Sequence, residues 1–482
     1  MKRVMNKLIL SMALTAGLWL PMAGQENGEE LVLDLQGAID HAFAYNLNLK
    51  NARMEVDRSR ASVWESIAAG LPQVDGTVDF LTYFNYELEF QFGVGDFEFT
   101  PEQIMDATNQ TMAKFPDATA QGLYDHAAGN FLDNTLQSMM PATTILMSDQ
   151  STARLQLSQL IFSGQYIVGV QTAKLARIIS EQNLEFNELN IKESVTNAYY
   201  LVLITEESLD ILAQNVKNLQ ETLDKTRVMY STGMAEKTDV DQLRITVNQL
   251  ENARRALERN LELNYNMLRF QLGVQPDVKL RLTDDLESLF MESEPESALS
   301  TPFVLDDNVT YQILKSQEEI NKKLMTIEKW NYAPTLAGFY TYNAKLLTTG
   351  FDMNPNHLAG LSLTVPIFSS GMRKAKVDQA RIDYNMAQNN RTLLEEQLGL
   401  QEKQFRFNLQ NSLDNYYTQK DNVEVARSVF DSFRWKYEQG VASSLDLTQA
   451  NSNYLDAETN YLTAILDVMN AKLALDKLMN KL

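Results

Sequence analysis

The sequence lacks cysteine and is poor in histidine, proline and glycine. Its 482 residues include no cysteine, three histidines, 11 prolines and 20 glycines. The absence of cysteine excludes disulfides and thiolate chemistry, and three scattered histidines argue against a histidine-rich zinc site. Because proline and glycine interrupt helices, their low content favours long, uninterrupted helices.

Basic residues are also in the minority. The chain has 42 Lys and Arg against 63 Asp and Glu, a formal net charge of −21. This balance excludes a strongly basic nucleic-acid binder. The sequence also offers no phosphate-binding glycine loop, no zinc-protease motif and no catalytic triad. Gly93-Val94-Gly95 is not a dinucleotide site, because it lacks the third glycine, the strand and the helix of that fingerprint. We therefore expect neither an enzyme nor a cofactor or metal site.

Only the N-terminus contains a long apolar run. Lys2, Arg3 and Lys7 precede the apolar segment Leu8–Leu20, and small residues follow it. Residues 1–24 are therefore typical of a secretory signal peptide. The alternative, an anchor helix, is disfavoured because the run is short for a bilayer. With no second such run, the exported chain is expected either to be soluble or to enter a membrane as a β-barrel.

The chain contains an internal duplication. Four landmarks recur in the same order: Asn46–Pro72 with Asn308–Pro334, Leu157–Ser163 with Leu363–Ser369, Tyr230–Gly233 with Tyr437–Gly440, and Asp239 with Asp446. Each copy is predicted to contain a helix, a proline, a strand, a loop, a strand, a long helix, a glycine turn and a long helix. We expect a first repeat at 25–275, a linking or equatorial segment at 276–308 and a second repeat at 309–482.

Apolar residues with 3-4 spacing predict four long helices. The spacing is clearest at Leu447, Ala450, Tyr454 and Ala457, and it continues as a coiled-coil seam toward the C-terminus. The helices are expected at about 166–232, 236–272, 372–439 and 443–480.

Strict alternation predicts four strands, at about 74–92, 152–162, 335–346 and 358–368. The alternation places aromatic and aliphatic residues on one face. Four acidic residues, Asp75, Asp79, Glu87 and Glu89, fall on the polar face, which would line the lumen of a barrel. This pattern is typical of transmembrane barrel strands, although a half-buried sheet in a soluble domain is the alternative. Since a barrel needs about eight strands, a barrel would require several chains.

In this arrangement the sequence resembles the TolC-like outer-membrane efflux proteins. The resemblance rests on the duplicated unit and on the segments Leu71–Gln73, Leu157–Gly164, Ala198–Tyr200, Tyr230–Val240, Val365–Gly371 and Tyr437–Leu447. It implies a mainly α fold with a β-barrel part. Three copies would close a 12-stranded outer-membrane barrel, continued by a periplasmic α-helical barrel. Segments 31–70, 276–333 and the C-terminus would form a belt around it.

The resemblance also implies the function and the partners. The homotrimer would be a passive export duct, joined through a periplasmic adaptor (membrane fusion) protein to an inner-membrane transporter of the RND, ABC or MFS type. The insertion 93–148 would face outward, either as a solvated cap or as a plug or partner-binding element. A periplasmic coiled-coil scaffold without a pore is the competing hypothesis. The sequence does not name the cargo.

The glycine turns are the candidate functional site. Gly233 and Gly440 allow tight reversals between long helices, because glycine accepts positive φ. By resemblance, four tip residues would dock the adaptor: Gly233, Met234, Gly440 and Val441. A further four would form the periplasmic gate: Thr238, Asp239, Tyr437 and Asp446.

Other roles stay open at the tips. Asp239 or Thr238 could equally cap the returning helix, and the Tyr437 hydroxyl could bond Asp239 on the neighbouring hairpin. Ala442 and Gln449 depart from the pattern, because some family members have an arginine and a second gate aspartate there.

Overall fold

The computed structural model describes residues 30–84, 87–90, 100–114, 121–122, 125, 129, 143–146, 149–347 and 355–482. The expected signal peptide and most of the 93–148 insertion lie outside these residues. The chain divides into two compact units. A helical unit comprises the chain up to Trp64, Val168–Glu328 and Met372–Leu482, and a strand unit comprises Glu65–Ile167 and Lys329–Gly371.

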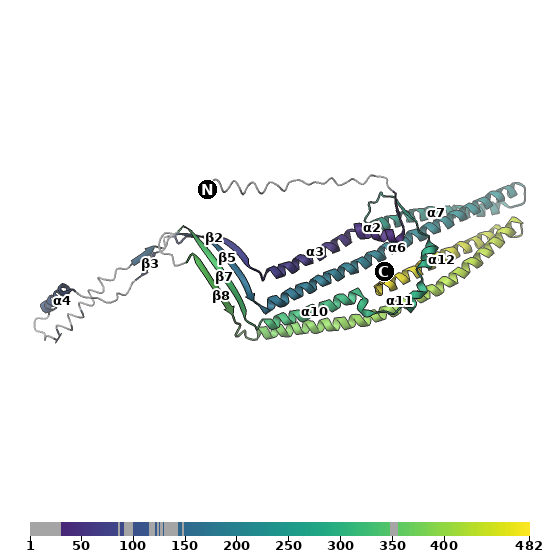
Figure 1. Ribbon diagram of the computed structural model, residues 1–482. Coiled ribbons are helices and arrows are strands. Elements are labelled where there is room, and N and C mark those ends of the chain that lie inside the picture. The colour runs from purple at the N-terminus through teal and green to yellow at the C-terminus, as the bar shows by residue number, and fades with distance from the viewer. Residues whose placement is uncertain are drawn as a thin grey trace. The chain divides into compact units, whose positions relative to one another are not determined.

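The strand unit contains one antiparallel sheet of four strands. These are β2 (Gln73–Leu81), β5 (Gln150–Phe162), β7 (Thr335–Leu347) and β8 (His357–Thr364), side by side in the order β2-β5-β7-β8 (Figure 1). The sheet therefore combines two strands from each repeat, and β2 and β8 are its outer strands.

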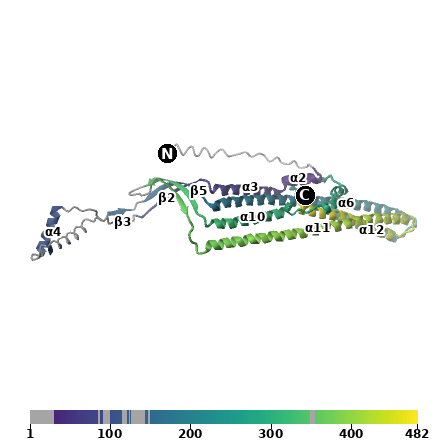
Figure 2. The ribbon, with the colours of Figure 1, turned by 60° about the horizontal axis from the view of Figure 1, so that its bottom comes forward.

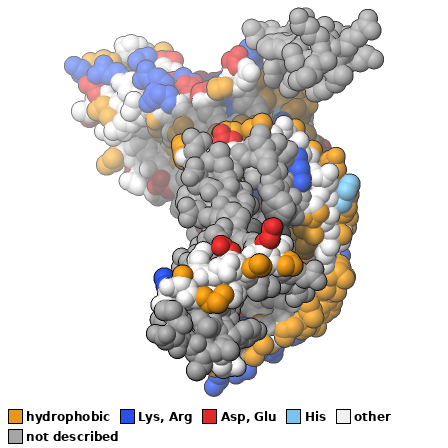
Figure 3. Space-filling model, turned by 90° about the vertical axis from the view of Figure 1, so that its left-hand side faces the viewer, with side chains coloured by type: hydrophobic (Ala, Val, Ile, Leu, Met, Phe, Trp, Pro, Cys, Tyr) orange, Lys and Arg blue, Asp and Glu red, His pale blue; other side chains and the backbone are white. Residues whose placement is uncertain are grey.

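The strand register separates an apolar face from a polar face. Val74 pairs with Leu157, which pairs in turn with Tyr340, whereas Asp75 pairs with Gln156 and Asp79 with Thr152. Paired residues lie on the same face of a sheet. Among the described residues, the apolar face is open to its surroundings, since Val78 and Leu361 are each 73% exposed. Figure 3 shows hydrophobic side chains gathered along one flank of the surface that it views.

The prediction of a single strand over 74–92 is wrong. β2 ends at Leu81, which pairs with Gln150, the first residue of β5. The chain then turns at Phe84, whose φ is +49°. Alternation resumes in a separate hairpin of β3 (Glu87–Phe90) and β4 (Thr143–Leu146). The strand breaks because its partner ends, which a periodic pattern does not reveal.

The last strand is also shorter than the expected 358–368. β8 ends at Thr364, which pairs with Thr335, the first residue of β7. Pro366, which has no N–H to donate to a ladder, follows closely. Within the insertion, α4 (Pro101–Lys114) begins at a proline, a residue favoured at the first helical position.

The helical unit contains two long hairpins. α6 (Gly164–Ser231) and α7 (Lys237–Leu272) form the first, and α11 (Met372–Glu438) and α12 (Ser444–Leu478) form the second. Figures 1 and 2 show both hairpins reversing at the same end of this unit. At 68 residues, α6 is roughly 100 Å long by the rise of an α-helix. Within the described residues, no helix is long and apolar enough to cross a membrane.

Two shorter helices extend the hairpins through equivalent asparagines. α3 (Leu47–Ala68) and α10 (Val309–Trp330) each have 22 residues. Asn46 Nδ2 donates to the Gln271 carbonyl in the last turn of α7 (2.8 Å), while its Oδ1 accepts from Asn48 N at the start of α3 (2.9 Å). The buried asparagine thus satisfies the end of one helix and the start of the next.

The second repeat contains the same junction. Asn308 Nδ2 donates to the Leu478 carbonyl at the end of α12 (2.9 Å), and its Oδ1 accepts from Tyr311 N in α10 (3.1 Å). Asn46 and Asn308 are 3% and 6% exposed. The duplication has therefore preserved the hydrogen bonding as well as the helix lengths.

Six short elements accompany the long helices of the helical unit. They are β1 (Leu31–Leu33), α2 (Leu35–Tyr45), β6 (Leu280–Leu282), α8 (Leu286–Glu292), α9 (Pro295–Ser300) and the 3₁₀ turn η1 (Leu305–Asp307). β1 and β6 pair in parallel. The Asp284 carboxylate accepts from Leu35 N (2.7 Å) and from the Tyr199 hydroxyl (3.0 Å), which ties these elements to α6.

Candidate functional site

Both hairpins reverse through the same helix-ending motif. Gly233 and Gly440 have φ of +79° and +69°. In the first hairpin, Met234 N donates to Met229 O (2.8 Å) and Gly233 N donates to Tyr230 O (3.1 Å). In the second hairpin, Val441 N donates to Lys436 O and Gly440 N donates to Tyr437 O. This is the Schellman arrangement, which requires a left-handed residue at the turn. Each motif places one apolar side chain on the surface of the tip, since Met234 and Val441 are each 76% exposed.

The two returning helices begin with capping boxes. Asp446 Oδ2 accepts from Ser443 N (3.1 Å) and Ser443 Oγ (2.7 Å), while Asp446 N donates to Ser443 Oγ (3.2 Å). In the equivalent place, Asp239 Oδ2 accepts from Glu236 N (3.1 Å). The capping role considered for Asp239 is therefore present. Thr238 instead donates to Glu236 Oε2 (3.1 Å).

Three polar contacts join the two hairpins at the tip. Ser444 Oγ donates to Asp239 Oδ1 (2.7 Å), linking the starts of α12 and α7. The Tyr437 hydroxyl of α11 lies 2.8 Å from Thr226 Oγ1 of α6. Lys225 Nζ lies 2.9 Å from Glu438 Oε1, an ion pair between the same two helices.

The possible bond between Tyr437 and Asp239 is not among these contacts within the chain. Within the chain, the buried Tyr437 hydroxyl pairs with Thr226, and the second oxygen of Asp239 pairs with Ser444. The sequence did not identify Thr226 or Ser444. Ser444 lies inside a readable Ser-x-x-Asp capping motif, whereas no local pattern marks Thr226, 211 residues from its partner.

Two of the tip residues, Asp446 and Tyr437, differ in their charge at neutral pH. Hydrogen bonds from Ser443 hold the pKa of the exposed Asp446 carboxyl below its ordinary value. Asp446 is therefore a stable negative charge at neutral pH. Burial raises the pKa of Tyr437, and the negative charge of Asp239 adds to the rise. Tyr437 therefore acts as a neutral hydroxyl.

A buried amide pair lies further along the bundle. Asn215 Nδ2 donates to Asn451 Oδ1 (2.8 Å), and Asn451 Nδ2 donates back to Asn215 Oδ1 (3.1 Å). These asparagines, on α6 and α12, are 4% and 1% exposed. A buried polar pair satisfied only in one alignment favours that alignment of the two helices.

Replacing one member of this pair should destabilise the protein, and replacing both should not. Asn215→Leu leaves the Asn451 amide buried without a partner, so we expect the free energy of unfolding to fall by about 1–3 kcal/mol. Asn215→Leu/Asn451→Leu should recover most of this loss. Denaturation midpoints in detergent measure both. A double variant that loses the sum of the two single losses would contradict the pairing.

The polar face of the strand unit carries both signs of charge. Asp75 and Asp79 of β2 lie on the same face as Arg154 of β5, since Thr77 pairs with Arg154. Arg154 and Lys345 line a hollow of about 370 Å³ on this face. Glu87 and Glu89 belong to the separate β3–β4 hairpin, and their side chains lie outside the described part.

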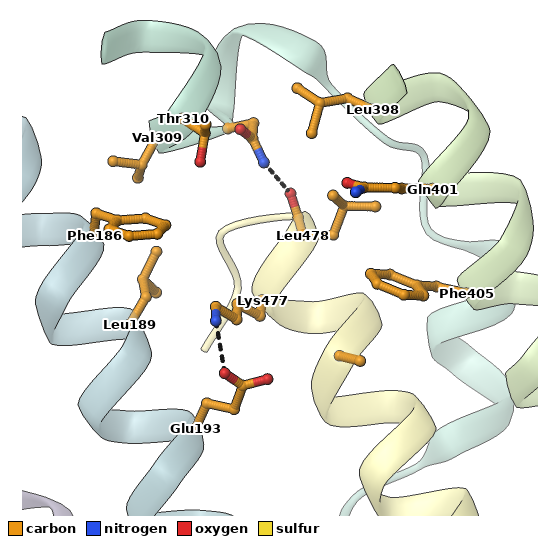
Figure 4. A pocket seen from close by; sticks show the side chains of 12 residues that line it. Phe186, Leu189, Glu193, Val309, Thr310, Leu398, Gln401, Phe405, Lys477 and Leu478 are labelled. Carbon is orange, nitrogen blue, oxygen red and sulfur yellow. Dashed lines mark hydrogen bonds and ion pairs between the residues drawn. The ribbon is translucent and has the colours of Figure 1, made fainter. Parts of the chain in front are cut away.

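A pocket of about 230 Å³ lies beside the junction of α12 and α10 (Figure 4). Phe186 and Leu189 of α6 face Leu398 and Phe405 of α11 across it. Lys477 pairs with Glu193 (2.6 Å) at its edge. The pocket is largely apolar, and its charged residues already pair with each other. Among the described residues, no group of three His, Cys, Asp or Glu side chains could hold a metal ion.

The family follows from comparison with known sequences. The model of a family described as "Outer membrane efflux protein" matches residues 134–274 and 332–481, which is more than half of the chain. The chain belongs to this family. The match confirms the resemblance drawn from the duplicated motifs, and it agrees with the prediction that the chain is not an enzyme.

Curated relatives of the chain include an efflux-pump component and a second outer-membrane protein. The toluene efflux pump outer membrane protein TtgC of Pseudomonas putida is 23% identical over 294 residues, 58% of each chain. The outer membrane protein TolC of Escherichia coli is 23% identical over 351 residues, 69% of this chain and 70% of that one. The chain thus spans less than two thirds of the length of TtgC.

Solved structures of similar fold include two outer-membrane proteins. VceC of Vibrio cholerae gives a TM-score of 0.65 at 16% identity, covering 92% of this chain and 95% of that one. The CmeC outer membrane channel of Campylobacter jejuni gives 0.66 at 13% identity, covering 97% and 90%. These likenesses confirm the mainly helical fold with strand pairs.

Proposed function

We propose that the chain is the outer-membrane channel of an efflux system and works as a homotrimer. The uncovered apolar face of the sheet carries this proposal. In water, such a contiguous apolar surface is unfavourable, whereas in a bilayer it faces lipid and the polar face lines an aqueous passage. This is the observation that favours a membrane channel over a periplasmic scaffold.

The open edges of the sheet support assembly. β2 and β8 are outer strands, and an unpaired strand edge favours pairing with another chain. Pairing the β8 edge of one chain with the β2 edge of the next gives a closed ring, which removes every edge. Three chains supply the 12 strands of such a barrel, above the roughly eight that a barrel needs.

The helical unit has apolar stripes that a neighbouring chain could cover. Exposed apolar residues on α11 repeat every seven positions, at Met386, Leu393, Leu400 and Phe407. On α7, the exposed side chains of Leu263, Met267 and Phe270 have helical 3-4 spacing. A heptad repeat of this kind indicates a helix partner. We infer that α11 of one chain packs against α7 of the next.

The proposed partners act at the tips. The exposed apolar residues Met234 and Val441, beside Gly233 and Gly440, would bind a periplasmic adaptor protein, which links the channel to an inner-membrane transporter of the RND, ABC or MFS type. The name of TtgC supports an efflux role, and the cargo would be set by the transporter.

Asp446, with Asp239, Thr238 and Tyr437, would form the gate. In a trimer, one Asp446 per chain gives three carboxylates around the axis, which attract cations and repel anions at a constriction. Asp446→Asn keeps an acceptor for the Ser443 cap but removes the charge. We expect higher conductance, or relief of block by multivalent cations, in planar bilayers. Unchanged conductance and unchanged block would remove Asp446 from the gate.

Fractionation and complementation test the proposed function. The chain is expressed in a bacterium deleted for its own efflux channel, together with its cognate pump and adaptor. We expect heat-resistant trimers in the outer-membrane fraction and restored resistance to a pump substrate. A soluble periplasmic monomer that restores nothing would instead support the scaffold.

A further inference from the structure

The hollow of about 370 Å³ on the polar face of the strand unit has the features of a ligand site. Its volume falls within the roughly 300–1,000 Å³ of small-molecule pockets. Polar side chains from the inner strands β5 and β7 form most of its wall: Thr152, Arg154, Gln156, Thr341, Asn343 and Lys345. Because β5 and β7 are not the edges at which chains would pair, the hollow is complete within one chain.

Two positively charged side chains lie at one end of the hollow. Arg154 of β5 pairs with Asn343 of β7. Lys345 lies two residues beyond Asn343, which makes it the diagonal neighbour of Arg154, about 7–8 Å away between Cα atoms. An anionic group placed between the two side chains would accept charge-assisted hydrogen bonds from both.

The buried amide of Asn343 holds Arg154 toward β7. Asn343 is 8% exposed, and its Oδ1 accepts from Arg154 Nε (3.4 Å) while its Nδ2 donates to the Pro355 carbonyl (3.1 Å). Asp75 and Asp79 of β2 lie on the same face, yet no ion pair joins Arg154 to either of these described residues. Because Asn343 takes the Nε donor, the two terminal nitrogens of the guanidinium can form a fork around an oxyanion.

The other end of the hollow is apolar. Phe339 lies four residues from Asn343 along β7, about 13 Å away at the rise of a strand. Its partner on β8 is Gly360, where a Cβ would lie 2.7 Å from Cζ of the Phe339 ring, so the ring fills the place of a side chain on β8. Leu358 and Pro355 complete the apolar wall. An apolar chain that extends from the charged end would be removed from water here.

We propose that this hollow binds an amphiphilic organic anion, whose carboxylate or sulfonate lies between Arg154 and Lys345 and whose apolar chain lies against Phe339 and Leu358. The inference rests on the proposed function, which makes the polar face the wall of the aqueous passage, so a trimer has three such sites. A small anion without a chain would use the charged end alone, and an amphiphilic cation would meet two positive charges. The site therefore selects its ligand by charge and by chain.

Binding of 1-octanesulfonate tests this inference. Trimers are placed in nanodiscs of neutral phosphatidylcholine, and binding is measured by equilibrium dialysis with protein-free nanodiscs as the blank. We expect 1-octanesulfonate to bind at least about tenfold more tightly than methanesulfonate, because only the longer probe reaches the apolar end. Octylammonium should not displace it. Equal affinity for the two sulfonates, or displacement by octylammonium, would overturn the inference, and both comparisons use the unaltered chain.

Substitutions locate the site. Arg154→Gln and Lys345→Gln should each weaken binding of 1-octanesulfonate about tenfold, since each removes one charge-assisted hydrogen bond. Lys329→Gln removes an equal charge from the last turn of α10, outside the hollow, and should bind as the unaltered chain does. Unchanged binding by Arg154→Gln and Lys345→Gln would place the ligand elsewhere and overturn the inference.

Bilayer conductance of the unaltered chain separates this inference from the proposed function. If trimers form and conduct but do not bind 1-octanesulfonate, the inference fails and the proposed function stands. If the chain neither forms trimers nor conducts, the proposed function fails, and the inference fails with it.

Discussion

Leu361→Arg is expected to abolish assembly of the protein in the outer membrane. Leu361 lies in β8, pairs with Gly338 and is 73% exposed. On the surface of a soluble protein, this substitution would be nearly neutral. If the face meets lipid, an arginine costs about 2–4 kcal/mol near the bilayer midplane, and a trimer contains the substitution three times. Heat-resistant trimers in the outer-membrane fraction, measured by gel, should disappear.

Ser362→Arg provides the matched control. Ser362 is the next residue along the same strand and pairs with Ala337, so it lies on the opposite face. An arginine there would face water, and we expect trimers at the level of the unaltered chain. If Leu361→Arg assembles normally, the apolar face does not meet lipid. If both variants fail equally, the damage comes from the strand itself, which would contradict the assignment of the faces.

Periodicity predicted the elements of the fold better than their ends. The expected helix at 166–232 is α6 at Gly164–Ser231, because its seam continues unbroken and Gly233 ends it. The strand expected at 74–92 ended instead at Leu81, because β5 provides no partner beyond Gln150. A partner strand brought together by folding leaves no trace in the alternation of one strand, so the sequence could not place this boundary.

The candidate site was predictable where it is local. Gly233, Gly440 and the capping aspartates lie within a few residues of the turns that they form, and their spacing recurs in both repeats. The contacts that join the two hairpins, in contrast, are made by residues far apart in the sequence. Thr226 meets Tyr437, and Asn215 meets Asn451, only because two separate hairpins pack together. Threonine and asparagine on a helix carry no signal of such a partner.

The asparagines at the helix junctions, Asn46 and Asn308, were only partly predictable from the sequence. Replacing either of them should have a large local effect on stability. The equal lengths of Asn46–Pro72 and Asn308–Pro334 were visible in the sequence, but the double role of each asparagine was not. Asn308→Ala removes the cap of α10, worth about 1 kcal/mol. It also leaves the Leu478 carbonyl without its side-chain donor, which costs about 1–3 kcal/mol when buried. Together, these two effects give an expected local loss of about 2–4 kcal/mol.

Hydrogen exchange measures this loss directly. A loss of about 2–4 kcal/mol corresponds to roughly 30- to 900-fold faster exchange at the Tyr311 amide, which donates to Asn308 Oδ1. Asn308→Asp retains the acceptor but not the donor to Leu478, and should show an intermediate increase. Asn321→Ala, which removes a bond within α10 to Gln317 O (2.9 Å), is the control and should change little.

Asn46→Ala extends the same prediction to the first repeat. Asn46 donates to the end of α7 and caps α3 as Asn308 does for α12 and α10, so the amides of Asn48 and Leu49 should exchange faster by a similar factor. If each asparagine makes two stacked helices behave as one, the faster exchange should extend to the last turn of the preceding helix, at Gln271 and Leu478. An effect confined to the first turn of α3 or α10 would leave each asparagine as an ordinary N-cap and would contradict the joining role.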